Sequence, residues 1–215
     1  MTIHAGERSQ PFLSDDTASH LVSLLAIAVG LGLAFQVGNF VEHAVQFLVW
    51  LCGKSEWIIS NFCGRDTPFM SRPVTELVGF MGAFLFPGAD IARQMMMGME
   101  ILHLVGNGLF LATIAGVFYF VPTKLVRYAF YIESAHMCEH IALTVSAYYF
   151  DNPIGLSTLF GHASAWWGRE AAVGWRVSWH FVMNLVPMPF VMIAIMQHKS
   201  ALLEHIPHGR GQGPS

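Results

Sequence analysis

The 215-residue sequence is poor in charge. Only 12% of its residues are Asp, Glu, Lys or Arg, whereas soluble domains carry roughly a quarter. With 11 basic and 14 acidic residues the formal net charge is -3, so there is neither the basic footprint of a nucleic-acid-binding protein nor an acidic tail. Hydrophobic residues make up 54% of the sequence, which predicts an integral membrane protein with the lipid bilayer as its solvent. Nucleic acid is excluded as a partner.

Cysteine is also scarce, with three in the whole sequence. Cys138 lies in an apolar stretch, whereas Cys52 and Cys63 flank a polar segment and would form a disulfide if that segment faced an oxidising compartment. The first residues mix both signs of charge and lack a basic segment ahead of a short apolar core, so they do not predict a cleavable signal peptide. We expect a polar tail over residues 1–18, a single transmembrane helical domain over 19–197 and a flexible polar tail over 198–215.

Four stretches are long and apolar enough to cross a bilayer, which takes about 20 residues. They cover roughly residues 20–52, 93–121, 125–150 and 171–197. Between the first two, the apolar run at residues 74–86 would rise only about 20 Å as a helix, short of the roughly 30 Å hydrocarbon core. We therefore predict an all-α polytopic membrane bundle of four transmembrane helices plus a short re-entrant or interfacial helix. A fifth crossing by the short run is the alternative.

The number of crossings decides the topology. With four crossings, Lys and Arg outside the helices split evenly between the two sides, and five crossings give the better bias. An even number, however, places His43, His103, His140 and His180 at about 13 to 17 Å from the same membrane face. The six tryptophans also fall at that face, as in an interfacial belt. We expect four crossings in the plasma or inner membrane, with both termini on the same side.

Polar residues share one face of each predicted helix, and that face must point into the bundle because lipid cannot satisfy it. These residues are Gln36, Asn39, Glu42, His43 and Gln46 in the first helix, Glu100, His103 and Asn107 in the second, Glu133, His136, Glu139 and His140 in the third, and Arg176, His180 and Asn184 in the fourth. Ionisable groups at this depth cost at least about 2.5 kcal/mol each, so we expect a bound ion to neutralise them. Arg176 is expected to be an interfacial charge or the partner of Glu139.

Imidazole nitrogens and carboxylate oxygens are donors to transition metals, and iron, copper and zinc all fit such a set. The predicted metal ligands are His43, Glu100, His103, Glu133, His136, His140 and His180. We expect Glu42 and Glu139 to act in catalysis, by carrying protons or orienting the ligands, and Asn107 and Asn184 to hold ligands or water.

Glu-x-x-His occurs twice, as Glu100 with His103 and as Glu133 with His136. This pattern resembles the repeated Glu-x-x-His motif of di-iron and di-manganese carboxylate bundles, which implies Glu42 or Glu139 as bridging candidates. The resemblance is limited to the motif chemistry. Here the two pairs lie on consecutive helices, carboxylates are fewer and histidines more numerous, so copper and zinc stay open beside iron.

Three functions fit this pattern. The first is a membrane metalloprotein with metal-dependent oxidoreductase activity on a small or lipophilic substrate. The second is a haem b electron-transfer subunit that uses two of the histidines as axial ligands. The third is a non-catalytic accessory subunit or a proton- or ion-conducting protein. Besides lipid, we expect other membrane subunits or a redox partner, and we expect the loop at residues 155–168 to lie at the face of the site, where it would suit a lid.

Overall fold

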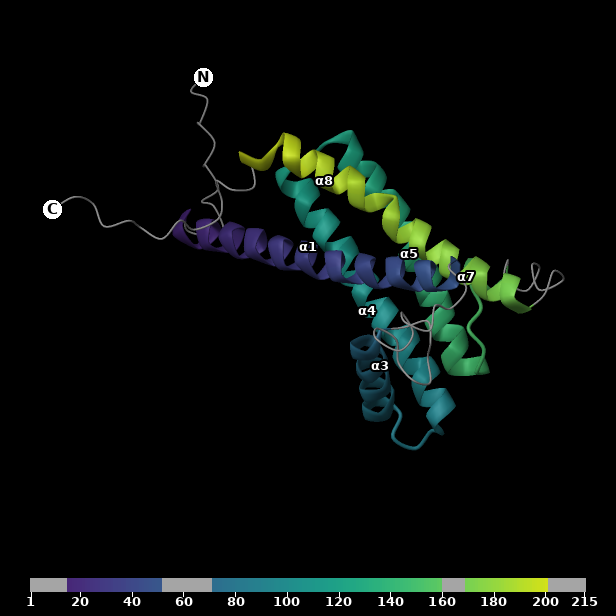
Figure 1. Cartoon of the computed structure of the whole chain (residues 1–215). Coiled ribbons are helices and arrows are strands. Elements are labelled where there is room, and N and C mark those ends of the chain that lie inside the picture. The colour runs from purple at the N-terminus through teal and green to yellow at the C-terminus, as the bar shows by residue number, and fades with distance from the viewer. Residues whose placement is uncertain (1–14, 52–70, 160–168, 201–215) are drawn as a thin grey trace, which may run out of the picture.

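The computed structural model describes residues 15–51, 71–159 and 169–200, and within these ranges no residue lies in a β-strand. The helices are α1 (Asp15–Leu51), α3 (Arg72–Leu85), α4 (Ile91–Phe120), α5 (Lys124–Phe150), α7 (Arg169–Leu185) and α8 (Pro187–Gln197). α1 packs against α4 and α7, and α5 packs against α4 and α8, so α1, α4, α5 and the consecutive pair α7 and α8 form an antiparallel bundle (Figure 1). The predicted all-helical bundle is confirmed.

Capping residues and prolines set the helix ends. The Asp90 side chain accepts from the Arg93 amide (2.9 Å) to begin α4, and the Thr123 hydroxyl accepts from the Val126 amide (3.4 Å) to begin α5. Pro187 has no amide hydrogen to donate, and the expected helix over residues 171–197 is interrupted at Val186, directly before it. α1 begins at Asp15, earlier than the sequence predicted.

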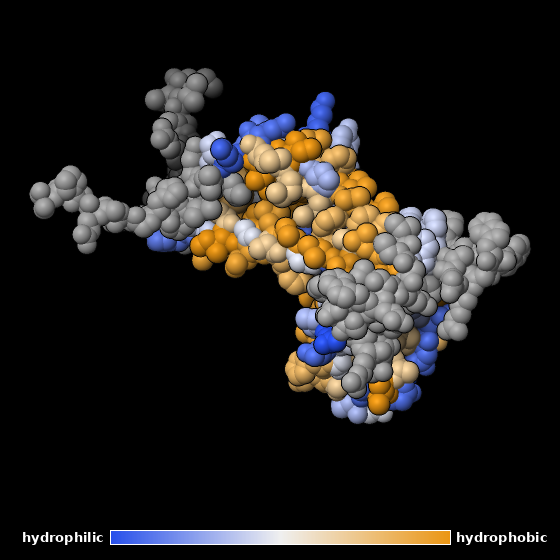
Figure 2. Space-filling model, in the orientation of Figure 1, coloured by the Kyte–Doolittle hydropathy of each residue, from blue (hydrophilic) through white to orange (hydrophobic). Residues whose placement is uncertain are grey.

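Among the described residues, three segments are long and apolar enough to span a membrane, and the four crossings expected are not confirmed. The three segments are Ser19–Trp50, Ile91–Phe120 and Gly174–Gln197. α5 has 27 residues, enough for a crossing, but the glutamates and histidines that it buries lower its mean hydropathy. Figure 2 shows apolar residues over the middle of the molecule and hydrophilic residues towards its ends, a surface compatible with lipid.

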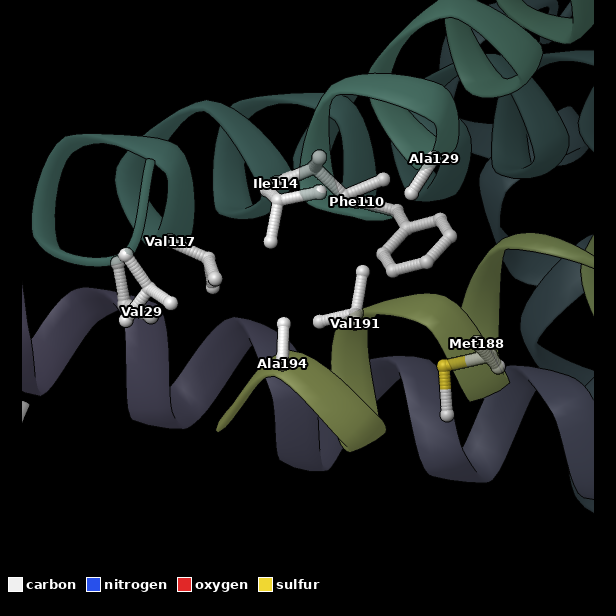
Figure 3. Packing of buried hydrophobic residues seen from close by; sticks show 10 residues of the cluster. Val29, Phe110, Ile114, Val117, Ala129, Met188, Val191 and Ala194 are labelled. Atoms are coloured by element: carbon white, nitrogen blue, oxygen red, sulfur yellow. The ribbon is translucent and has the colours of Figure 1, made fainter. Parts of the chain in front are cut away.

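An apolar layer fills the half of the bundle where α1 begins and α8 ends. Its residues are Val29, Phe110, Ile114, Val117, Val121, Val126, Ala129, Met188, Val191 and Ala194, most of which are visible in Figure 3. Small residues allow α1 and α4 to approach closely here, because a side chain at Gly32 would overlap Thr113 and one at Gly116 would overlap Val29. The layer is therefore tightly packed, and the polar side chain beside it, Thr113, donates its hydroxyl to the Leu109 carbonyl of its own helix.

α3 is a 14-residue helix, about 21 Å long, and is too short to cross a bilayer. The Ser71 amide at its start donates to the Glu42 carboxylate of α1 (2.9 Å), and the helix then packs beside the first half of α4 (Figure 1). Gly82 and Gly98 bring the two backbones into direct contact. α3 therefore runs from the level of Glu42 to the end of the bundle where α4 begins.

Several sequence predictions fall outside the described residues. The Cys52–Cys63 disulfide, most of both predicted tails and residues 160–168 of the predicted lid loop are among them. Cys138, which the structure does describe, is a free and exposed cysteine on α5.

Candidate metal centre

Five histidines from four helices meet in the bundle interior. They are His43 of α1, His103 of α4, His136 and His140 of α5, and His180 of α7. Neighbouring ring centroids lie 4.6 to 6.0 Å apart. All are buried except His103, which is partly buried. The predicted convergence of these side chains at one depth is present in the structure.

The antiparallel packing explains why they meet. Arg93 near the start of α4 contacts the Tyr148 carbonyl and the Asp151 carboxylate at the end of α5, at 3.2 and 3.1 Å. Counting inward from this end of the bundle in opposite directions along the chain brings His103 beside His140. His136 and His140 are four residues apart and therefore lie on one face of α5.

Two of the imidazoles are held in a defined tautomer by the backbone. His103 Nδ1 lies 2.8 Å from the Met99 carbonyl oxygen, and His180 Nδ1 lies 2.8 Å from the Arg176 carbonyl oxygen. A carbonyl can only accept, so Nδ1 is the protonated nitrogen in both rings. Nε2 is then the nitrogen with the free lone pair, and its direction is fixed, which is how proteins commonly orient histidine ligands of metals.

The histidines of α5 and α7 form the group best suited to a metal ion. His136 Nε2 and His140 Nε2 lie 3.0 Å apart, and one ligand atom from each of His136, His140 and His180 lies within 4.8 Å of the others. Metal–nitrogen bonds are about 2.0–2.1 Å, so small side-chain shifts would bring the three nitrogens onto one ion. This group could hold a transition metal.

Several buried nitrogens of the cluster have no hydrogen-bond partner. These are both ring nitrogens of His43 and the Nδ1 atoms of His136 and His140. An unpaired buried polar group costs about 1–3 kcal/mol, and native interiors contain few of them. A bound ligand could satisfy the unused lone pairs or protons of these three imidazoles.

Glu133 is the carboxylate that lies closest to this group. Its side chain is 0% exposed, and its nearest partner is His136 Nδ1, 3.6 Å from Oε2. That distance is too long for a hydrogen bond, and both carboxylate oxygens are unpaired. Glu133 is therefore free either to bind an ion or to accept a proton from the His136 ring.

Glu100, a second predicted ligand, is engaged by Arg176. Arg176 Nη2 donates to Glu100 Oε1 at 2.6 Å, and the Glu100 side chain is only 1% exposed. Arg176 was expected at the interface or beside Glu139, but its guanidinium neutralises Glu100 while its backbone carbonyl fixes His180. The pair thus ties α4 to α7 directly beside two of the imidazoles.

The two carboxylates predicted to act in catalysis accept hydrogen bonds from backbone amides and from the side chains of Trp179 and Gln46. Glu139 Oε1 accepts from the Ser157 amide (2.7 Å), and Oε2 accepts from Trp179 Nε1 (2.6 Å). Glu42 accepts from the Ser71 amide and from Gln46 Nε2 (3.3 Å). Glu139 therefore holds the loop at residues 151–159 against the bundle, and Glu42 holds the start of α3.

Amide side chains form a layer between the histidines and the apolar layer. This amide layer consists of Gln36, Asn39, Asn107 and Asn184. Gln36 Nε2 donates to Asn184 Oδ1 (3.0 Å), and Asn184 Nδ2 donates to the His180 carbonyl (2.8 Å). Asn107 likewise donates to the His103 carbonyl (2.8 Å), which leaves its buried Oδ1 without a partner. Asn107 and Asn184 thus support the turns that carry two of the imidazoles.

Two residues of the site had no signal in the sequence. Ser157 is fully buried although it follows a run of turn-forming residues, and its hydroxyl has no partner. Trp179 was assigned to the interfacial belt because of its residue type, but its indole reaches inward to Glu139. No local pattern reveals such contacts, since both depend on which helices become neighbours.

The fold and the site together define a helical bundle with a surface compatible with lipid and a buried imidazole cluster that could bind a metal. Residues 15–203 match the family model described as Family of unknown function (DUF6008), which spans most of the chain, so the chain belongs to this family. No curated protein and no solved structure matches the chain. Its function must therefore be inferred from the geometry of the site.

Proposed function

We propose that this chain is an integral membrane metalloprotein whose imidazole cluster binds a redox-active transition metal and that it acts as an oxidoreductase on a small or lipophilic substrate. The observation that carries the proposal is the set of five converging imidazoles with unpaired buried nitrogens. Iron and copper suit nitrogen-rich sites of this kind and would supply electron transfer, whereas zinc would supply only Lewis acidity.

We also propose that α5 crosses the membrane with the three apolar segments, so that both chain ends lie on one side of the plasma or inner membrane. The antiparallel order of the helices supports four crossings, because α1 begins and α8 ends at the same end of the bundle (Figure 1). The lipid bilayer would surround α5 and its neighbours, while the polar face of α5 points into the bundle, where its histidines meet those of the other helices. α3 would be a re-entrant helix that enters from the opposite side as far as Glu42.

In this proposal the buried carboxylates have different roles. Glu133, with both oxygens unpaired, is the candidate ligand or proton acceptor next to His136. Glu139 and Glu42 position the loop and α3 around the site and would act on the reaction only through that positioning. Arg176 neutralises Glu100 beside the site.

A haem b subunit is a weaker explanation of the same histidines. A porphyrin separates its two axial imidazoles and needs an apolar slot between helices. Here the imidazoles contact one another directly, with His136 and His140 nitrogens 3.0 Å apart, and two glutamates lie among them. A small ion fits such a cluster better than a macrocycle.

Proton or ion conduction across the whole bundle is also weakly supported. Beyond the amide layer the described core is apolar, and the buried Thr113 hydroxyl found there donates to the Leu109 carbonyl of its own helix. A conducting path would need polar groups or water through this half as well. An accessory role within a larger membrane complex stays compatible with a bound metal and with a redox partner.

The test is to purify the full chain in mild detergent and to measure bound metals by elemental mass spectrometry together with an optical spectrum. We expect near-stoichiometric iron or copper that is lost in His140→Ala and retained in His198→Ala, whose histidine is exposed outside the cluster. Far-UV circular dichroism checks that both variants are folded. Absence of metal and of chromophore would contradict the proposal, a Soret band would replace it with the haem subunit, and zinc alone would remove the oxidoreductase part.

A further inference from the structure

The five imidazoles do not all contact one another. The ring of His180 contacts the other four, and His136 and His140 pair with each other on α5. His43 contacts the rings of His103 and His180, at 5.5 and 6.0 Å between centroids. Among the described side chains, it makes no ring contact with His136 or His140. His43 and the pair of α5 histidines therefore lie at opposite ends of the cluster.

A single ion cannot use all of these ligands. Metal–nitrogen bonds of about 2.1 Å require that two nitrogens on one ion lie at most about 4.2 Å apart. His136, His140 and His180 come close to this limit, with ligand atoms within 4.8 Å of one another. Within the described residues, neither His43 nor His103 belongs to that group. An ion bound by the three histidines would leave the two imidazoles at the other end without an ion to bind.

These two remaining imidazoles have the properties of ligands. The His43 side chain is 2% exposed, and neither of its ring nitrogens has a hydrogen-bond partner. His103 has its Nδ1 proton bound by the Met99 carbonyl, which leaves the Nε2 lone pair available. An unpaired buried imidazole beside a fixed, available nitrogen is a costly arrangement unless something binds between them.

A carboxylate lies at this end of the cluster as well. Glu100 precedes His103 by three residues on the same face of α4, and Arg176 occupies its Oε1. A carboxylate accepts through both oxygens, so Oε2 can bind a cation while Arg176 holds the group in place. The other end of the cluster has its own carboxylate, Glu133, which lies 3.6 Å from His136.

We propose that the cluster holds two transition-metal ions, the first on His136, His140 and His180 and the second on His43, His103 and Glu100. This inference rests on the proposed metalloprotein function and deepens it. Each end of the cluster then supplies imidazole nitrogens to its own ion. Side-chain shifts would be needed to bring His43, His103 and Glu100 onto the second ion, since their ligand atoms do not all lie within 4.8 Å of one another. The unpaired nitrogens of His43 and the two separate Glu-x-x-His pairs both follow from this arrangement.

The experiment counts ions in the intact chain with cobalt(II) alone as the probe. The detergent-solubilised protein is stripped with a chelator, incubated with excess cobalt(II), desalted and analysed for cobalt per chain. We expect two ions in the native protein and in His198→Ala, and one ion in His43→Ala and in His140→Ala. Far-UV circular dichroism and elution volume check that each variant is folded.

The outcomes separate this inference from the function on which it rests. One cobalt per chain in the native protein, or an unchanged count in His43→Ala, would overturn the second position and leave the metalloprotein proposal standing. No cobalt in the native protein would overturn both. A second measurement needs no variant: in a copper(II) titration followed by electron paramagnetic resonance, the second equivalent should broaden the signal of the first through dipolar coupling. Saturation at one equivalent, or two independent signals, would again exclude two neighbouring ions.

Discussion

The pair formed by Arg176 and Glu100 offers the most quantitative test of the fold around the site. Glu100 is 1% exposed and relies on one guanidinium contact of 2.6 Å for its charge. Removing one partner of a buried ion pair costs about 3–5 kcal/mol, because the other charge is left uncompensated. Water reaches part of the Arg176 side chain, which is 31% exposed, so we expect Arg176→Met to lie near the lower limit, at about 3 kcal/mol.

The measurement is a double-mutant cycle with Arg176→Met, Glu100→Gln and the combined variant. Unfolding of the chelator-treated protein is followed by far-UV circular dichroism as sodium dodecyl sulfate is added to mixed micelles, so that lost metal binding does not contribute. We expect the combined variant to be more stable than Arg176→Met alone, because no bare carboxylate is left in the interior. The coupling energy should be about 2 kcal/mol, within the range found for residues in direct contact. A coupling below about 0.5 kcal/mol would refute the view that Arg176 neutralises Glu100.

Three further predictions concern the contact between α3 and α4, the loop at residues 151–159 and the bound metal. Gly98→Ala should destabilise the protein, because its methyl group would meet the α3 backbone at Val78. Gly30→Ala places its methyl group in open space and should be neutral or slightly stabilising. Thermal unfolding compares the two variants, and equal effects would contradict the close approach of α3 and α4. Glu139→Ala should speed hydrogen exchange of the Ser157 amide roughly 30-fold, because it removes a charge-assisted hydrogen bond. The control Glu76→Ala, on the surface of α3, should leave this exchange rate unchanged. An unchanged rate in Glu139→Ala would show that Glu139 does not hold the loop. Removal of bound metal should lower the free energy of unfolding by about 2.7 kcal/mol relative to protein in free metal at 100 times its dissociation constant. Identical unfolding curves with and without metal would contradict metal binding to the folded state.

The helices of this protein could be located from the sequence because each relies on local signals. Long apolar runs mark α1 and α4, while Asp90, Thr123 and Pro187 mark where helices begin. α5 shows the limit of this approach. Its inward face carries so many polar side chains that hydropathy alone does not identify it as a membrane span, although it packs against two of the apolar helices. Hydropathy treats Glu133 and His136 as if they faced lipid, whereas both are fully buried in protein.

The site was predictable in its histidines and much less so in its carboxylates. Depth along an antiparallel bundle follows from counting residues, so His103 and His140 could be expected to meet. The partner of a glutamate depends on the rotation of the helices and on which loop returns to the bundle. Glu139 therefore found the Ser157 amide and the Trp179 indole, and Glu100 found Arg176, through contacts that no spacing within one helix specifies.

The order of the layers along the bundle has a consequence for how the site is reached. From the end where α4 begins, the Glu100–Arg176 pair comes first, then the imidazoles, then the amide layer and finally the apolar layer. A proton or a polar molecule moving through the apolar layer would lose most of its hydrogen bonds, which costs several kcal/mol. Passage past Arg176, whose side chain is partly exposed, involves no such loss. On the proposed function, polar reactants and protons would therefore reach the histidines from the side of Arg176 and the loop at residues 151–159, and a lipophilic substrate would pass between helices from the bilayer.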